Sequence, residues 1–339
     1  MKKTPIILDM DPGADDALAI LLAVKSQAFD IKGITICGGN VSSDQCARNA
    51  AKVLNFLKVD IPIYKGSYRP LTASPKISDY VHGTDGLGNI SSKWTYNEDL
   101  IKKISATDFI LETLDKNPNL KIIATGPLTN IAKCISKNRP LMSKLKHLYW
   151  MGGAYTCAGN VTPVGEFNAI CDPQAAKEVF DSYIPMTVVG LDVTMKLMLP
   201  KDTVDTLAKE GNETAKFCQE ILKAYFSYYT AYTSKPQCCL HDPLAVLVCL
   251  FPDLVSDCKI YKVDVSLEGI TEGQTIIDRR PYYKWHDSDF LKYYEKEKDN
   301  FKKYGINEIM PTTNVVLDLN FKKALDKFIS IVFKGPQKV

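Results

Sequence analysis

The densest group of chemically active side chains lies near the start of the chain, in the run Asp9-Met10-Asp11-Pro12-Gly13-Ala14-Asp15-Asp16. Its four carboxylates cannot all stay charged without compensation, because like charges about 4 Å apart repel by roughly 4 kcal/mol at an effective dielectric of about 20. No histidine or cysteine lies nearby in the sequence, so the available ligands are oxygen atoms. Such a set favours a hard divalent cation, calcium or magnesium, over zinc.

Two other interpretations of this acidic run stay open on its residues alone. Asp15 or Asp16 could cap the following helix while the remaining carboxylates face solvent, which is a common fate of acidic residues after strands. The pair Asp9-x-Asp11 also resembles the nucleophile and acid of haloacid-dehalogenase-like, metal-dependent phosphatases. Pro12-Gly13 argues against that family, which would have threonine or valine at position 13.

Alternating strands and helices must hold these residues in place. Apolar and β-branched runs predict strands over 3–9, 31–37, 120–124, 147–151 and 186–191, and the intervening patterns predict helices over 17–26, 44–57 and 173–182. Such an alternation predicts an α/β fold with an open, mostly parallel, Rossmann-like sheet and flanking helices. Ligands of these sheets bind at the carboxyl ends of the strands, where nearly every polar cluster of this chain falls.

The chain is expected to form a single domain over residues 1–339, because no Pro-, Gly- or Ser-rich linker divides it. The C-terminal third has a less regular pattern. It contains an aromatic helical stretch over 224–232 and a charged tract over 292–303. We expect this third to form an irregular cap on the sheet.

Composition restricts the possible partners. A net charge of +3, from 42 basic and 39 acidic residues, leaves no basic surplus for binding nucleic acid. No apolar stretch is long enough to span a membrane, and the apolar run Ile6-Ile7-Leu8 is too short for an export signal, so we expect a soluble, cytoplasmic protein.

The ten cysteines include no CxxC pair and are interpreted as reduced core residues. Cys238-Cys239 is the one place where redox chemistry is to be checked.

The acidic run is similar to the Asp-x-Asp-Pro-Gly-x-Asp-Asp-Ala signature of the nucleoside hydrolases, the inosine-uridine preferring family, and residues 9–17 match each fixed position. Further matches follow in the family's order at Gly38-Gly39-Asn40, at 124–130, at 165–168, at 241–243 and near Thr313. The resemblance implies an enzyme that hydrolyses the N-glycosidic bond of ribonucleosides to ribose and free base for nucleoside salvage. It also implies a homodimer or homotetramer.

Site residues follow from the resemblance. It implies that Ca²⁺ is bound by four ligands, namely Asp11, Asp16, the backbone carbonyl of Thr125 and Asp242. Asp11 would also deprotonate the attacking water. Ribose hydroxyls would be bound by a second set: Asp15, Asn40, Asn160, Glu166 and Asn168. For Asn160 considered alone, an ordinary turn residue remains the alternative.

The leaving base needs a proton, and the resemblance assigns this role to His241. Its unperturbed pKa near 6.5 suits proton transfer, although a histidine before Asp-Pro could also be structural. The family's purine-specific branch has tryptophan at this place, so the chain is more similar to the non-specific or pyrimidine-accepting branches. His82, in a glycine-rich loop, is expected to lie in the pocket. One tyrosine of the 225–232 stretch is also expected to reach it, and the choice among them stays open.

Overall fold

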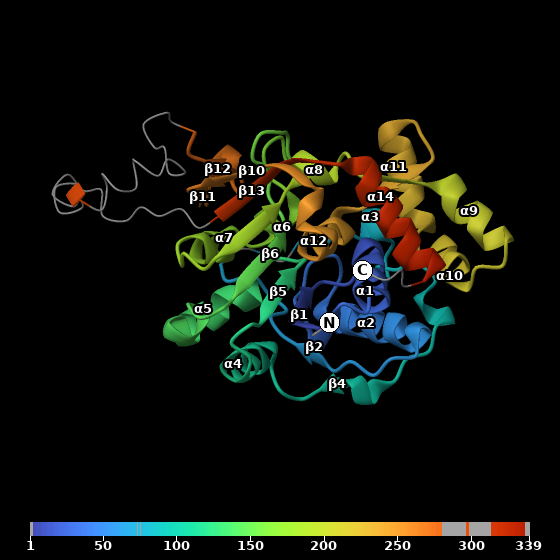
Figure 1. Cartoon of the computed structure of the whole chain (residues 1–339), viewed down its shortest axis with the longest axis horizontal. Helices are drawn as coiled ribbons and strands as arrows, with labels where there is room; N and C mark the ends of the chain where they lie inside the picture. The colour runs from blue at the N-terminus through green and yellow to red at the C-terminus, as the bar shows by residue number, and fades with distance from the viewer. Residues whose placement is uncertain (1–2, 73, 75, 280–295, 298–312, 336–339) are drawn as a thin grey trace.

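The core of the computed structural model, which describes residues 3–72, 74, 76–279, 296–297 and 313–335, is a nine-stranded sheet (Figure 1). Its strand order is β10-β13-β7-β6-β5-β1-β2-β3-β4, and every neighbouring pair is parallel except β10 and β13. The strands are β1 (Thr4–Met10), β2 (Phe29–Ile36), β3 (Ile63–Lys65), β4 (Ile101–Lys102), β5 (Lys121–Ala124), β6 (His147–Met151), β7 (Met186–Val189), β10 (Val255–Tyr261) and β13 (Thr313–Leu319). Two small antiparallel pairs are added by β8 (Met198–Pro200) with β9 (Gln237–Cys239) and by β11 (Val263–Val265) with β12 (Thr275–Ile277).

Strand β1 lies inside the sheet, between β5 and β2, and its apolar residues are buried on both faces. Ile6 and Leu8 pack into one hydrophobic core, and Ile7 packs into the other. An apolar run without alternation is typical of a parallel strand covered on both sides by helices. The residues that follow β1 therefore emerge at the carboxyl edge of the sheet, at its centre.

Helices cover both faces of the sheet (Figure 1). One face is packed by α1 (Ala14–Lys25), α2 (Ser43–Leu57), α10 (Glu213–Ile221), α12 (His241–Leu250) and α14 (Phe321–Ile329), and the other by α4 (Ala106–Lys116), α5 (Thr129–Met142) and α7 (Pro173–Phe180). The remaining helices are α3 (Asp79–His82), α6 (Phe167–Cys171), α8 (Leu191–Thr194), α9 (Lys201–Lys209) and α11 (Lys223–Thr233). A layered α/β fold results, as the strand and helix patterns predict.

Polar side chains fix where several helices begin. Ser42 accepts a hydrogen bond from the backbone N–H of Gln45 at the start of α2, and Glu166 accepts from the N–H groups of Asn168 and Ala169 at the start of α6. The carboxylate of Asp16 turns back to accept from Gly13 N at 2.9 Å. Caps of this kind satisfy the first N–H groups of a helix, which have no partner within it.

The predicted elements are confirmed with shifts of a few residues at their ends. Helix α1 begins at Ala14 rather than at Ala17, because the Gly13 cap places Asp15 and Asp16 in the first helical turn. The C-terminal third is more regular than predicted, since β10 and β13 extend the sheet through antiparallel and parallel pairing. Of the charged tract 292–303, all but Lys296 and Glu297 lie outside the described residues.

The cysteines are all free, and eight of the ten are buried, as predicted for reduced core residues. Cys157 and Cys258 are exposed. Cys238 and Cys239 are both buried, and the Cys239 thiol packs against the sulfur of Met198 at 3.5 Å. Within the described residues, no helix is long and apolar enough to cross a membrane.

Asp9, the first carboxylate of the acidic run, is part of the sheet rather than of the cluster that follows it. It is fully buried at the end of β1, where one carboxylate oxygen accepts hydrogen bonds from Thr35 Oγ1 at 2.6 Å and from Asn130 Nδ2 at 2.8 Å. Burial raises the pKa of Asp9 to about 6 despite these two bonds. Asp9 thus ties β1 to β2 and to α5.

We expect Thr35→Val to lower the free energy of unfolding by about 1–3 kcal/mol, because it removes a partner from a buried carboxylate without changing side-chain size. Urea unfolding measures this difference. Thr35→Ser keeps the hydroxyl and serves as the control, with a smaller loss. Equal stability of Thr35→Val and the natural protein would show that this bond contributes nothing.

Candidate active site

A cavity of about 520 Å³ opens at the carboxyl edge of the sheet, where the loops after β1, β2, β5 and β6 meet. Of the predicted site residues, all except Asp11 and Asp16 line it: Asp15, Asn40, His82, Thr125, Asn160, Glu166, Asn168, His241 and Asp242. Asp11 and Asp16 are fully buried. The structure therefore brings together residues that are up to 231 positions apart, as parallel strands ending at one edge require (from 11 to 242).

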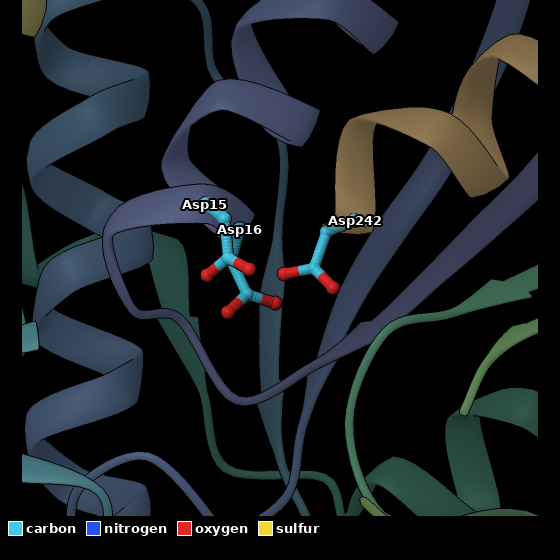
Figure 2. A group of neighbouring side chains, drawn as sticks. All are labelled: Asp15, Asp16 and Asp242. Carbon is cyan, nitrogen blue, oxygen red and sulfur yellow. The ribbon is translucent and has the colours of Figure 1, made fainter. Parts of the chain in front are cut away.

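Three carboxylates face one another at the base of this cavity. Asp15 and Asp16 extend from the first turn of α1, and Asp242 extends toward them from the start of α12 (Figure 2). One oxygen from each lies within 4.8 Å of the others. Thr125 Oγ1 donates to Asp16 at 2.7 Å, and Tyr225 donates to Asp15 at 3.2 Å.

Asp11 is held separately, in a cradle of backbone. Its Oδ2 atom accepts from the N–H of Asn40 at 2.8 Å. A Cβ atom on Gly39 would lie 2.0 Å from Asp11 Oδ2, and one on Gly126 would lie 2.6 Å from Oδ1. These two glycines allow the loops after β2 and β5 to close on the carboxylate, which explains why glycine accompanies the acidic run at such distant positions.

The electrostatics of the cluster fit a bound cation. Burial raises the pKa values of Asp15 and Asp16 to about 6, and burial together with neighbouring carboxylates raises those of Asp11 and Asp242 well above the usual range. Among the described residues, no lysine or arginine forms an ion pair with any of the four. The Oδ1 atoms of Asp11 and Asp15 are buried without a hydrogen-bond partner. A hard divalent cation would offset this charge and occupy these oxygens.

The observed carboxylate group overlaps the predicted ligand set without matching it fully. Asp16 and Asp242 belong to both, whereas Asp15, which we expected at the ribose, is the third member of the observed group. The carbonyl of Thr125 accepts a hydrogen bond from Asn168 Nδ2 at 2.8 Å and keeps a second lone pair. Asp11 interacts electrostatically with this carboxylate group, since its negative charge raises the pKa of Asp242.

Amide and acidic side chains form the wall that was predicted for the ribose. Asn40 donates through Nδ2 to Asp16 at 3.2 Å and accepts from Ser78 at 2.6 Å. Glu166 is buried and accepts from Gly153 N at 2.8 Å. Asn160 is exposed, and its side-chain oxygen accepts from Phe167 N at 2.9 Å, so this residue both lines the cavity and braces its own loop.

Two buried histidines also line the cavity. His82 Nδ1 accepts from the backbone N–H of Ala14 at 3.2 Å, and the ring stacks on Tyr225 with centroids 5.2 Å apart. His241 lies between two hydroxyls, with Tyr229 2.6 Å from Nε2 and Thr194 2.7 Å from Nδ1. Burial lowers the pKa of His82 to about 4 and that of His241 to about 3. Both rings are neutral at pH 7, so the ordinary value near 6.5 used for His241 does not hold in this pocket.

Helix α11 contributes more to the site than its helical spacing indicated. Four of its tyrosines line the cavity: Tyr225, Tyr228, Tyr229 and Tyr232. Tyr225 and Tyr229 are buried with their hydroxyls on Asp15 and His241, whereas Tyr232 is 67% exposed. The four tyrosines stand at i, i+3, i+4 and i+7 and so share one face of the helix, which is why several reach the cavity instead of one.

Asp192 and Thr194 were not singled out from the sequence as site residues. Asp192 lines the cavity and accepts from the N–H groups of Tyr155 and Thr156 at 2.9 and 2.7 Å. Its position directly after a strand was the available signal. No signal in the sequence pointed to Thr194, because its partner His241 lies 47 positions further along the chain.

Comparison with known proteins agrees with this geometry. Residues 6–324 match the family model described as inosine-uridine preferring nucleoside hydrolase. Uridine nucleosidase 1 of Arabidopsis thaliana is 34% identical over 85% of each chain, and the pyrimidine-specific ribonucleoside hydrolase RihA of Citrobacter koseri is 35% identical over 81% of this chain and 88% of its own. Among solved structures, the purine-preferring ribonucleoside hydrolase from Gardnerella vaginalis has a TM-score of 0.84 at 30% identity, covering 97% of this chain and 98% of its own.

These relatives are all nucleoside hydrolases, and none supports the alternative of a haloacid-dehalogenase-like phosphatase. The match runs through the acidic run and through His241-Asp242-Pro243, the two segments whose carboxylates meet in the cavity. The chain belongs to the inosine-uridine preferring nucleoside hydrolase family and is a nucleoside hydrolase.

Proposed function

We propose that this enzyme hydrolyses ribonucleosides with a calcium ion held by the carboxylates at the base of the cavity, with Asp11 as the base that activates water. The observation that carries the proposal is the convergence of unpaired buried carboxylates on a cavity with an amide-lined wall and an aromatic wall. Such a cavity has a polar side for a sugar diol and an apolar side for a flat base.

The oxygen donors suit calcium better than a softer metal. The donor set would be Asp11, Asp15, Asp16, Asp242 and the carbonyl of Thr125. Calcium accepts six to eight oxygens in flexible geometry, so carboxylates leave room for ribose hydroxyls and water. When bound, the ion supplies charge that lowers the pKa of water and of the acidic side chains around it.

Asp11 is proposed as the general base because the glycine cradle fixes it while one of its oxygens stays without a protein partner. Asn40, Asn160, Glu166 and Asn168 would bind the ribose and keep its anomeric carbon facing this oxygen. Cleavage of a glycosidic bond passes through an oxocarbenium-like state, and carboxylates beside the sugar stabilise its positive charge.

A proton for the leaving base would come from the pair Tyr229 and His241. The ring of His241 is neutral, so it acts through an N–H group or through the Tyr229 hydroxyl at 2.6 Å, and not as a preformed cation. His82, stacked on Tyr225, would lie beside the base. Mobile protons at this wall are needed because a departing base carries negative charge unless it is protonated.

Pyrimidine ribonucleosides are the proposed preferred substrates, with uridine first. Support comes from the curated relatives, which are named as a uridine nucleosidase and as pyrimidine-specific hydrolases.

A reducing-sugar assay over inosine, guanosine, adenosine, uridine and cytidine, with and without a calcium chelator, tests the proposal. Release of free base and ribose that stops with the chelator supports it, and release of phosphate from a nucleotide instead would contradict it.

We expect Asp11→Ala to reduce turnover at least about 10²-fold, because it removes the base that activates water. The matched control is Asp9→Asn, two residues away and equally buried, whose carboxylate is bound within the sheet. Steady-state kinetics of both variants, together with urea unfolding, separates the roles. A comparable loss of turnover in Asp9→Asn would argue that both changes act through folding.

We expect His241→Ala to slow hydrolysis of natural nucleosides by about 10²–10⁴-fold but to affect 4-nitrophenyl riboside much less, because that leaving group departs without a proton. His147→Ala is the control, since His147 lies at the other end of β6 and contacts Thr187. The measurement is kcat/KM on both substrates. Equal losses on the two substrates would remove His241 from the proton-donating role.

We expect Ca²⁺ to raise the melting temperature more at pH 7.5 than at pH 5. Asp15 and Asp16 have pKa values raised to about 6 from 3.8, so in the ion-free protein their contribution to stability is present below about pH 3.8 and is lost as the pH rises through 6. Calcium binds the deprotonated carboxylates and restores the loss. Thermal unfolding with calcium or chelator at both pH values, with Asp242→Asn as control, measures this. Equal shifts at both pH values would contradict an ion bound at these carboxylates.

A further inference from the structure

The loop over residues 152–166, here called the ribose loop, carries much of the polar wall of the cavity. It connects β6 to the Glu166 cap of α6 and contributes Thr156, Asn160 and Glu166 to the lining. A loop of this length has no strand or helix of its own to set its shape. Its position must therefore come from contacts with other parts of the chain.

One set of anchors includes the start of α8, which follows the neighbouring strand β7. Asp192, just after β7, accepts from the N–H groups of Tyr155 and Thr156 and from the Thr156 hydroxyl. Glu166 accepts from Gly153 N and so closes the loop on itself. These contacts hold the side of the ribose loop that faces the cavity.

The second set comes from β12, outside the main sheet and more than a hundred residues further along the chain. The hydroxyl of Thr275 accepts from Ala154 N at 3.0 Å and donates to Ala154 O at 2.9 Å. Gln274 forms an isolated antiparallel bridge with Gly165, and Arg279 donates to Tyr155 O at 3.0 Å. Residues 274–279 thus hold both the beginning and the end of the ribose loop from behind.

The single hydroxyl of Thr275 forms hydrogen bonds with both backbone groups of Ala154. A hydroxyl can donate and accept at once, so one side chain satisfies both backbone groups of a buried residue, as a neighbouring strand would. Thr275 is 2% exposed and does not line the cavity. Strand β12 holds it in place by pairing with β11, where Thr275 faces Val265.

We propose that Thr275 is a positioning residue for ribose binding, which acts through Ala154 to set the ribose loop. This inference rests on the proposed function, in which Asn160 and Glu166 bind the sugar. It assigns a task to the strand pair β11–β12, which is separate from the main sheet.

The test compares Thr275→Val, which keeps the shape of the side chain but removes both bonds, with Thr275→Ser, which restores the hydroxyl. Thr187→Val is the matched control, because Thr187 is a buried threonine whose hydroxyl binds His147, and it does not line the cavity. Three experiments are made on each variant: uridine kinetics, giving KM and kcat, inhibition by D-ribose, and amide hydrogen exchange over 152–166.

For Thr275→Val we expect faster exchange in the ribose loop, weaker inhibition by D-ribose and a fall in kcat/KM of about 10–100-fold, mostly through KM, because misplacing binding groups by about 1 Å has effects of this size. Calcium affinity measured by calorimetry stays unchanged, since the loop supplies no carboxylate of the Asp15, Asp16 and Asp242 group. Thr275→Ser recovers most of the activity.

Unchanged exchange and KM in Thr275→Val would overturn the proposal, and so would an equal rise of KM in Thr187→Val, which would indicate general destabilisation. The proposed function fails separately: if the natural enzyme releases no ribose from any nucleoside, the assignment of the sugar site is wrong. Hydrogen exchange still reports in that case whether Thr275 holds the loop.

Discussion

Burial of several carboxylates in one place, with no lysine or arginine paired with them among the described residues, is the constraint on which the active site depends. Asp11, Asp15, Asp16 and Asp242 are all removed from solvent, and burial favours the protonated form of each. A fold selected only for stability would avoid such an arrangement, because a buried carboxylate without a cationic partner is destabilising. The arrangement makes physical sense when a divalent cation completes it.

The parallel sheet is what makes this arrangement possible. Strand β1 ends at the centre of the sheet, so the acidic run has neighbours on both sides, from β2 through Asn40 and from β5 through Thr125. Asp242 arrives from α12, which packs against α1 on the same face. The cap hydrogen bond and the close glycine contacts then fix the carboxylates, so their positions depend little on flexible side chains.

Much of this could be predicted from the sequence because the relevant signals are local. Five strands, three helices and the acidic run follow from short apolar periods and from residues that stand next to one another, and the signature placed Asp242 in the same site. The sequence placed Asp9 at the end of a strand but did not show that its carboxylate is bonded within the sheet, because its partners Thr35 and Asn130 lie 26 and 121 residues away. Thr194 and Thr275 were missed for the same reason, as single hydroxyls with distant partners. Strand β10 was missed because this edge strand lacks a continuous apolar run, whereas β13 begins at Thr313, where the family resemblance gave its last match.

The tyrosines of α11 connect two parts of the site, the carboxylate group and His241. Tyr225 donates to Asp15 in the carboxylate group, Tyr229, one turn later, bonds to His241, the proposed proton donor, and the two tyrosine rings are in contact. A designer who reshapes this wall to accept a larger nucleobase would therefore also disturb an oxygen of the carboxylate cluster. Under the proposed function, selectivity for the base and affinity for the ion would share one helix, so redesign of either would require adjustment of the other.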